Sequence, residues 1–593
     1  MTKSKKKINL IVTAAMLLTQ STAFAETELT LRAEDYSIPA WNSLLRNVAK
    51  LSLANTPYSI NMTVNGDPAT RMAFAWFTNK CDEAGVVQIV AKADATEEDF
   101  LNSTMVIPAS MTQVTGLNYS IEKNYLDGVT PNQKVDYTSH KALATGLNPS
   151  TSYSFRVGNE SAWSEIGHFT TANADRNEPY TFIYITDTQA QNDAMFNVSQ
   201  KTLHAAIKQV PEASFVLCNG DLVETSGSNN SEWEYEQWFS TMQDVWLSYP
   251  LVVTMGNHDK SPNGNFGYHF FNSTDFNNKA AVKTAMDGTV FSFVRGDVLY
   301  MILSYEDYAV EGYLESLSEW MRTTVKENED VNWRVVSFHK NMFTGSKSHQ
   351  DDADGKVVRA KMLPLFDELG INIAFQGHDH IYEVIGPVKN ADKTLVENGV
   401  ESVEIIDEGG LRENMTGKAG GVFDVSGGTL YFLNNSAGKK KYEPRNEEEM
   451  IASLDKHEIK NYWGLFSGKF GQTGEPTFSK VEVSKDAFVI TTYTVDDNGD
   501  SSVFDSFKVV KDNTSSINEV DGDNETRNIF YLSDGIISAV DMQIERIEMY
   551  ALDGKLIDAS YNSTLRIGDI PSGIYIVKGY VANKVYAQKI VIA

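Results

Sequence analysis

The sequence is short of cysteine and of positive charge. Its 593 residues include 2 cysteines, and 51 basic residues face 79 acidic ones, for a formal net charge of −28. Oxidising surroundings would permit one bridge between Cys81 and Cys218, but Cys218 lies in the apolar run FVLC, which predicts a buried free thiol. A chain this acidic lacks the basic face that nucleic acid requires, so its charge argues against nucleic acid as a partner. Small phosphorylated substrates are not excluded, because bound cations can invert the local field.

Long apolar runs are also lacking, apart from one near the N-terminus. The chain begins MTKSKKKINLIVTAAMLLTQSTAFAETE, with lysines first, then an apolar stretch, then Ala23 and Ala25 before Glu26. This pattern is typical of a cleaved secretory signal over residues 1–25, and its apolar part is too short to span a membrane stably. We therefore expect no transmembrane segment and a protein that is secreted or held at the cell surface after export through the periplasm.

Strand and turn patterns divide the remaining chain into three parts, in line with its length. After an N-terminal segment (26–56), alternating strands such as RMAFAWFT and TSYSFRVG predict a β-sandwich over 57–172. Over 178–511, apolar strands such as YTFIYIT and WRVVSF alternate with helical patterns such as SEWEYEQWFSTMQDVW and YLESLSEWMRTTVKE, which predicts an α/β domain. A polar linker (512–528) then precedes a small all-β domain over 529–593.

Polar side chains follow five apolar strands of the predicted α/β domain. In open α/β sheets, ligands bind beyond the carboxyl ends of the strands, so these side chains can converge in one crevice. A single strand-end Asp is more often a helix cap or a turn residue. Chance does not readily explain the whole set in this order. The set is Asp187, Asp221, Asn257 with His258, His339, and the pair His378 and His380.

These side chains supply nitrogen and oxygen donors and no sulfur. Such a set suits Zn, Fe or Mn rather than a thiolate site. It is too large for one catalytic metal that keeps an open position, but it suits two. One carboxylate would then bridge ions that lie ~3.5–4 Å apart.

In chain order the motifs D-x-x, GD-x-x, GNHD, H and GHDH resemble those of calcineurin-like metallophosphoesterases. A β-sandwich before that domain, together with GHDHIYE, resembles the purple acid phosphatase branch, and this resemblance covers residues 57–511. Within the sandwich, HKALATGLNPSTSYSFRVG resembles the end of a fibronectin type III-like domain. Near the C-terminus, YALDGKLI and IPSGIYIVK resemble the sorting domain of type IX secretion cargo, which implies the export machinery as a partner.

The resemblance implies two packed mixed sheets flanked by helices and two divalent or trivalent ions of Fe, Zn or Mn. It also implies a role for each strand-end residue. His258 would face the substrate as a catalytic residue, and His349, in HKNMFTGSKSH, is a second candidate for that role. The first metal would take Asp187, Asp221 and His380, and the second would take Asp221, Asn257, His339 and His378, with Asp221 as the bridge.

The sequence departs from the purple acid phosphatase pattern at two positions. Glu224 in GDLVE stands where those enzymes have the tyrosine whose phenolate gives the purple colour, and Gln189 in DTQ stands where the wider superfamily has a histidine ligand. Either residue could complete the first metal's shell, or both could face away from the metals. We predict that the protein lacks the purple charge-transfer band. The run KKK at 439–441 could attract phosphate, although a charge run is usually solvated surface.

The function that the resemblance implies is that of an exported, acid phosphatase-like enzyme that hydrolyses phosphate monoesters with a metal-activated water. A phosphodiesterase, or a hydrolase of nucleotides or inositol phosphates, would use the same site. A third hypothesis is a surface binding protein with an inactive phosphoesterase domain. The sequence supports this hypothesis less than an enzyme, because each donor type of the metal set is present at its expected strand end.

Overall fold

The computed structural model describes two parts of the chain, which fall in two compact units, Met1–Asp512 and Asn513–Ala593. The predicted signal, the predicted linker and nearly all of the segment 26–56 lie outside the described residues. No helix in the described parts is long and apolar enough to cross a membrane. The described residues are 55–511 without 104, 120–132, 262–263, 277–287, 350–351, 391–402, 406–420, 447 and 450–468, and 530–592 without 534–535, 540–543, 552–554, 561, 569, 572 and 582–583.

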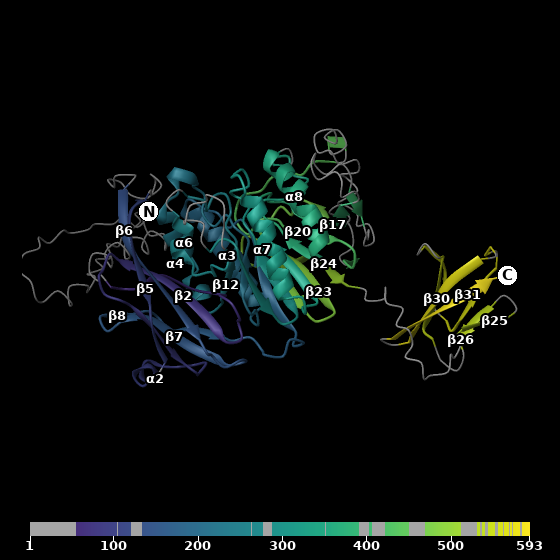
Figure 1. Cartoon of the computed structure of the whole chain (residues 1–593), viewed down its shortest axis with the longest axis horizontal. Helices are drawn as coiled ribbons and strands as arrows, with labels where there is room; N and C mark the ends of the chain where they lie inside the picture. The colour runs from purple at the N-terminus through teal and green to yellow at the C-terminus, as the bar shows by residue number, and fades with distance from the viewer. Residues whose placement is uncertain are drawn as a thin grey trace, which may run out of the picture. The chain divides into compact units, whose positions relative to one another are not determined.

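One long sheet runs through both the predicted sandwich and the predicted α/β domain, in the order β19-β24-β23-β22-β10-β11-β12-β1-β2-β6-β5 (Figure 1). Strands β10, β11 and β12 pair in parallel, β12 pairs in parallel with β1, and the sandwich strands beyond β1 pair antiparallel. Its strands are β19 (Val422–Asp424), β24 (Ser501–Val510), β23 (Ala487–Val495), β22 (Thr477–Val483), β10 (Tyr180–Ile185), β11 (Val216–Cys218), β12 (Leu251–Val253), β1 (Tyr58–Thr63), β2 (Arg71–Asn79), β6 (Gln133–Thr145) and β5 (Ser110–Tyr119).

A second sheet of the α/β domain runs β13-β14-β15-β16-β20-β17-β18, and β21 pairs with β17. Strands β14, β15, β16 and β20 are parallel, so β15 and β16 end at the same edge. The strands are β13 (Phe291–Arg295), β14 (Val298–Ile302), β15 (Trp333–Ser337), β16 (Ile373–Phe375), β20 (Thr429–Asn434), β17 (Tyr382–Asn390), β18 (Val403–Ile405) and β21 (Phe470–Gly471).

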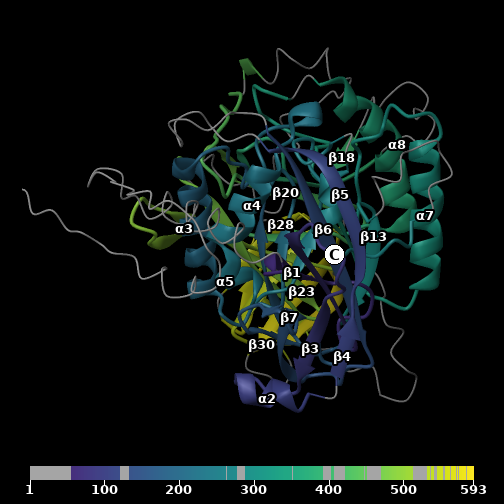
Figure 2. The ribbon, with the colours of Figure 1, turned by 90° about the vertical axis from the view of Figure 1, so that its left-hand side faces the viewer.

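The two sheets pack face to face between two layers of helices. Along β10, Phe182 and Tyr184 belong to the core between the sheets, whereas Ile183 and Ile185 belong to the core under the helices, as the period of two requires. Figure 2 shows α3 and α5 on one side of the molecule and α7 on the other. The helices of this domain are α3 (Asp193–Gln209), α4 (Glu232–Thr241), α5 (Gln243–Trp246), α6 (Asn265–His269), α7 (Tyr313–Glu327) and α8 (Ala353–Leu369).

Two helical patterns of the sequence can be compared with the helices of the structure. The pattern at 313–327 forms α7 as predicted. The pattern at 231–246 is divided into α4 and α5, because the backbone of Met242 leaves the helical region at φ −125° and ψ 22°. Both halves still bury their aromatic side chains, so packing rather than ligand binding explains the aromatic run.

The sandwich closes with a second, smaller layer in the order β4-β3-β7-β8, with β9 paired to β7. Its core joins Phe74 and Trp76 of the long sheet to Phe155 and Phe169 of this layer. The predicted sandwich is therefore confirmed as an all-β region that shares a sheet with the α/β domain. The smaller layer comprises β3 (Val86–Val90), β4 (Met105–Pro108), β7 (Ser152–Asn159), β8 (Ala162–Trp163) and β9 (Gly167–Thr170), with α2 (Glu97–Leu101) between β3 and β4.

The C-terminal unit consists of strands in its described residues. They form the sheets β25-β26-β29 and β28-β27-β30-β31, which share a small apolar core around Ile547, Met549 and Val577. The strands are β25 (Phe530–Ser533), β26 (Ile536–Ala539), β27 (Arg546–Ala551), β28 (Leu556–Ser560), β29 (Thr564–Arg566), β30 (Gly573–Val581) and β31 (Lys584–Ile592).

Candidate metal centre

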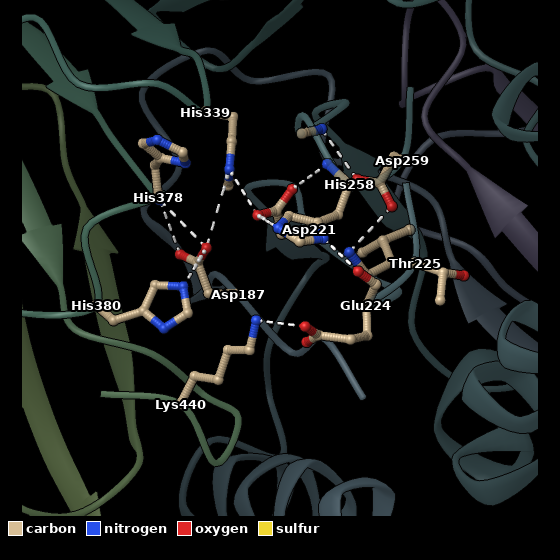
Figure 3. Close-up of polar contacts among 12 residues, drawn as sticks. Asp187, Asp221, Glu224, Thr225, His258, Asp259, His339, His378, His380 and Lys440 are labelled. Carbon is tan, nitrogen blue, oxygen red and sulfur yellow. Dashed lines mark hydrogen bonds and ion pairs between the residues drawn. The ribbon is translucent and has the colours of Figure 1, made fainter. Parts of the chain in front are cut away.

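The strand ends of the two packed sheets meet at one place. Strands β10, β11 and β12 of the long sheet deliver Asp187, Asp221 and Asn257, and β15 and β16 of the second sheet deliver His339 and the pair 378–380. In Figure 3 the carboxylates of Asp187 and Asp221 face the rings of His339 and His380. The crevice therefore lies between the ends of two sheets.

The backbone turns sharply where these residues leave their strands. Asp187 and Asp221 have φ values of 54° and 52°, and His378 and His380 have 76° and 44°. Such left-handed conformations are uncommon for residues other than glycine and cluster at functional sites. The turns bring a carboxylate or an imidazole from the end of each strand into the crevice.

The first group of donors surrounds Asp187. His380 Nε2 lies 3.1 Å from Asp187 Oδ1. The backbone N–H of His378 donates to both carboxylate oxygens, at 3.2 and 3.0 Å. A Cβ on Gly377 would lie 2.5 Å from Thr186 Oγ1, so only glycine permits this close approach of the chain.

The second group surrounds Asp221. His339 Nε2 lies 3.1 Å from Asp221 Oδ2 and 3.9 Å from Asp187 Oδ1, so His339 faces both carboxylates. Ligand atoms of Asp221, His339 and His378 all lie within 4.8 Å of one another. Asp221 is 1% exposed and His339 is 2% exposed, so neither group is solvated.

Hydrogen bonds fix which ring nitrogen of two histidines faces the crevice. His339 Nδ1 lies 2.8 Å from the carbonyl oxygen of Asn219, and His258 Nδ1 contacts the carbonyl oxygen of Glu224. A carbonyl only accepts, so each Nδ1 carries a proton and Nε2 is turned toward the carboxylates. A metal-ligating histidine is oriented in the same way.

The donor atoms have spacings that suit a metal ion. Ligands about 2.1 Å from one ion lie roughly 3.0–3.4 Å apart at octahedral or tetrahedral angles, which matches the 3.1 Å separations at Asp187 and Asp221. The buried Oδ1 of Asn257 has no hydrogen-bond partner among the described residues. Buried polar atoms without partners are costly, and a bound cation would satisfy this one.

The electrostatics of the buried groups also favour a cation. Burial opposes ionisation of Asp221, but the charge of His339 outweighs it and holds the pKa of Asp221 well below its usual range. Burial would lower the pKa of His339, but the charges of Asp221 and Asp187 raise it to about 10. Burial and the charges of His339 and His349 push the pKa of His378 well below its ordinary value. Two carboxylates thus hold one positive charge between them, in the place where a metal would bind.

The two candidate catalytic histidines lie at the rim. His258 is partly exposed, its backbone N–H donates to Asp221 Oδ1 at 2.9 Å, and its Nε2 lies 3.9 Å from Asp221 Oδ2. The ring centroid of His349 lies 3.9 Å from that of His378, and its Nδ1 lies 2.9 Å from Asp352 Oδ2. Both histidines therefore border the donor set.

The two departures from the family pattern occupy different surroundings. Gln189 is 1% exposed, and neither polar atom of its side chain has a hydrogen-bond partner among the described residues. The Glu224 side chain extends toward Lys440, and its Oε1 lies 2.5 Å from Lys440 Nζ (Figure 3). The other oxygen, Oε2, is buried and has no hydrogen-bond partner in the same set of residues.

The strand-end patterns of the sequence did not include the segment that follows β20. Ser436 Oγ and the backbone N–H of Gly438 donate to the carbonyl oxygen of Asp187, at 2.8 and 3.1 Å. The ring of Tyr442 stacks on His380 with centroids 4.4 Å apart. Of the two interpretations of the run at 439–441, solvated surface does not describe Lys440, whose side chain is 29% exposed and paired with Glu224.

Asp259 holds two turns of the site together through hydrogen bonds from their backbones. It accepts hydrogen bonds from the backbone N–H groups of Gly256 and Leu222, at 2.9 and 3.0 Å. Burial and the charge of Asp221 raise its pKa to about 7. Asp259 therefore ties the turn after β12 to the turn after β11, and it orients backbone rather than a histidine ring.

Comparison with known proteins separates the two regions of the first unit. Residues 57–171 match the family described as purple acid phosphatase, N-terminal domain, and residues 180–382 match the calcineurin-like phosphoesterase family. The first match covers the sandwich, and the second covers the α/β domain from β10 to the start of β17. No match identifies the sandwich as fibronectin type III-like or the C-terminal strands as a sorting domain, so both remain predictions.

Curated relatives and a solved structure agree with these families. Purple acid phosphatase 15 of Arabidopsis thaliana is 27% identical over 310 residues, which cover 47% of this chain and 56% of that protein. Purple acid phosphatase 1 of Ipomoea batatas is 24% identical over 377 residues, 61% of this chain and 71% of that protein. The chain spans about half the length of several curated relatives that it matches.

The fold has a solved counterpart. The purple acid phosphatase PPD1 from yellow lupin (Lupinus luteus) seeds superposes with a TM-score of 0.53 at 13% identity, over 78% of this chain and 75% of that one. The chain therefore carries a purple acid phosphatase N-terminal domain followed by a calcineurin-like phosphoesterase domain, and purple acid phosphatases are among its homologues.

Proposed function

We propose that the protein is an exported binuclear metallophosphoesterase that hydrolyses phosphate monoesters. The observation that carries this proposal is the convergence of Asp187, Asp221, His339 and His380 at 3.1–3.9 Å, inside a domain of a phosphoesterase family. The donor set, the unpartnered Asn257 oxygen and the raised pKa of His339 all support the binding of cations.

The residues present fit two ions, of Fe, Zn or Mn. Asp187, Asp221 and His380 would hold the first, and Gln189 is our candidate for its remaining protein ligand, because both of its buried polar atoms are without partners. Asp221 would bridge to the second. Asn257, His339 and His378 would complete the second ion's protein ligands.

When bound, two such ions supply Lewis-acid activation of water and neutralise charge on the phosphoryl oxygens. The chain's own residues must orient the ester and deliver a proton to the leaving oxygen. His258 is our candidate for that delivery, because its Nδ1 is held on the Glu224 carbonyl and its Nε2 lies 3.9 Å from Asp221 Oδ2. His349, oriented by Asp352, borders the same space on the His378 side.

The deciding experiment joins elemental analysis to a phosphate-release screen on the purified full chain. We expect about two ions per chain, as a two-metal site requires, and faster release from an aryl monoester than from the matching diester. Preference for the diester would replace the monoester assignment by that of a phosphodiesterase. Absence of bound metal after reconstitution with Fe, Zn and Mn would favour a binding protein instead.

Export is the part of the proposal that depends on the sequence alone. The N-terminal pattern supports cleavage after Ala25, and the strands after the linker support a C-terminal sorting domain. Mass spectrometry of the protein recovered from the medium or the cell surface should find Glu26 at the mature N-terminus. An intact N-terminus on protein retained in the cytoplasm would contradict export.

A further inference from the structure

The segment 435–442, after β20, is tied to the site at both ends. On one side, Gly438 donates its backbone N–H to the Asp187 carbonyl, and a Cβ at this position would lie 2.6 Å from that oxygen. On the other side, the Tyr442 backbone N–H donates to the His380 carbonyl at 3.4 Å, and the Tyr442 ring stacks on the His380 ring. Lys440 lies midway between these anchors, so its side chain starts beside two candidate ligands of the first metal.

The ammonium of Lys440 is turned into the site rather than into solvent. Its Nζ lies 2.5 Å from Glu224 Oε1, and Figure 3 shows it reaching toward the donor set from the side of His380. Its neighbours Lys439 and Lys441 are exposed. A lysine that only solubilised the surface would be exposed like these two.

Hydrogen bonds hold the backbone of Glu224 in place. Its backbone N–H donates to Glu234 Oε2 at 2.8 Å, and its carbonyl oxygen accepts from His258 Nδ1. One residue thus connects the candidate proton donor with Lys440. Among the described residues, Glu224 is the ion-pair partner of Lys440. An ammonium has three N–H donors, so it can bind a further anion besides this carboxylate.

We infer that Lys440 is a substrate-binding residue that contacts the phosphate, and that Glu224 positions its ammonium instead of ligating the first metal. This inference rests on the proposed phosphoesterase function and adds a phosphate-binding cation supplied by the chain itself. A dianionic phosphate offers several oxygens, so it can share the ammonium with Glu224. A charge-assisted hydrogen bond of this kind is among the stronger ones in proteins.

The test compares Lys440→Met, Lys440→Arg and Lys439→Met in the metal-loaded full chain. Calorimetry gives the affinity for orthophosphate, and steady-state kinetics give KM for an aryl monoester. We expect Lys440→Met to weaken orthophosphate binding and raise KM by roughly tenfold or more, with metal content and melting temperature unchanged. Lys440→Arg should recover most of the affinity, and Lys439→Met should match the parent protein.

Two results would overturn the inference. Orthophosphate affinity unchanged in Lys440→Met would show that the ion pair is only structural. Loss of a metal ion in Glu224→Gln would show that Glu224 is a metal ligand, whereas we expect that variant to keep both ions. If the parent protein neither binds orthophosphate nor hydrolyses esters, the proposed function itself fails, which is distinct from either result.

Discussion

The two halves of the long sheet show what strand direction does for function. In the α/β half, β10, β11 and β12 are parallel, so their carboxyl ends meet at one edge and deliver three donors to one crevice. In the sandwich half, β1, β2, β6 and β5 alternate in direction, so successive strand ends fall on opposite edges. The same sheet thus builds a site where its strands run parallel and a scaffold where they alternate.

Two buried histidines, one in the sandwich and one at the candidate metal centre, make the same contrast. His140 in β6 stacks on Trp76 at 5.1 Å and its Nε2 lies 3.0 Å from Thr78 Oγ1, and burial lowers its pKa to about 4. In His339 the nearby carboxylates overcome burial and raise the pKa to about 10. Burial alone makes a histidine neutral, and it takes convergent carboxylates to make a cation site.

Removing a donor from the parallel half should have the largest effect. Asp221→Ala deletes the carboxylate that faces His339 and His258, so we expect loss of bound metal and at least about a thousandfold loss of activity. Elemental analysis and phosphate release measure the two effects. Asp136→Ala in the sandwich, where the carboxylate pairs with Lys80, is the control and should change neither. Full metal content in Asp221→Ala would contradict the bridging role.

Removing a rim residue should separate chemistry from metal binding. We expect His258→Ala to keep its metal but lose about 10²–10⁴-fold in rate, most severely for esters with poor leaving groups, because general acid catalysis contributes that much. Rates with a series of leaving groups of different pKa check this. A uniform loss across the series would assign His258 to binding, and unchanged rates would remove it from the mechanism.

Metal binding should release protons from the candidate metal centre. Because the pKa of His339 is raised to about 10 by Asp221 and Asp187, the free site holds a proton at neutral pH that a metal must displace. Metal affinity should therefore fall by about tenfold per pH unit as pH decreases below that pKa. Titration calorimetry in two buffers of different ionisation enthalpy counts the protons. A count of zero at pH 7 would contradict the protonated state.

The sandwich should show the smallest effect, and one of a different kind. The folded-state pKa of His140 lies below its unfolded value, so its contribution to stability is complete above pH 6.5 and is lost as pH falls from 6.5 toward 4. We expect the melting temperature of His140→Gln to fall less over this range than that of the parent, by the equivalent of up to about 2 kcal/mol. Equal falls in both proteins would contradict the assignment.

The sequence alone determined the order of the domains and the residue types at the strand ends. Apolar runs bounded by Asp187, Asp221 and the histidine pair 378–380 are local patterns, and local patterns follow from burial and strand geometry. The helix at 313–327 could be predicted in the same way, because the spacing of its apolar residues is also a local pattern. These features can be predicted because each depends on residues close together in the chain.

Only the tertiary structure decided the rest. The family resemblance implied two packed sheets, but the sequence did not show that the sandwich continues one of them, because pairing such as β12 with β1 joins residues almost 200 positions apart. The sequence also left open whether the run at 439–441 is solvated surface or attracts phosphate, because a charge run carries no period and no strand-end position. The Lys440 ammonium meets Glu224 only after β20 has placed the following segment over Asp187, and such a long-range contact is specified by packing.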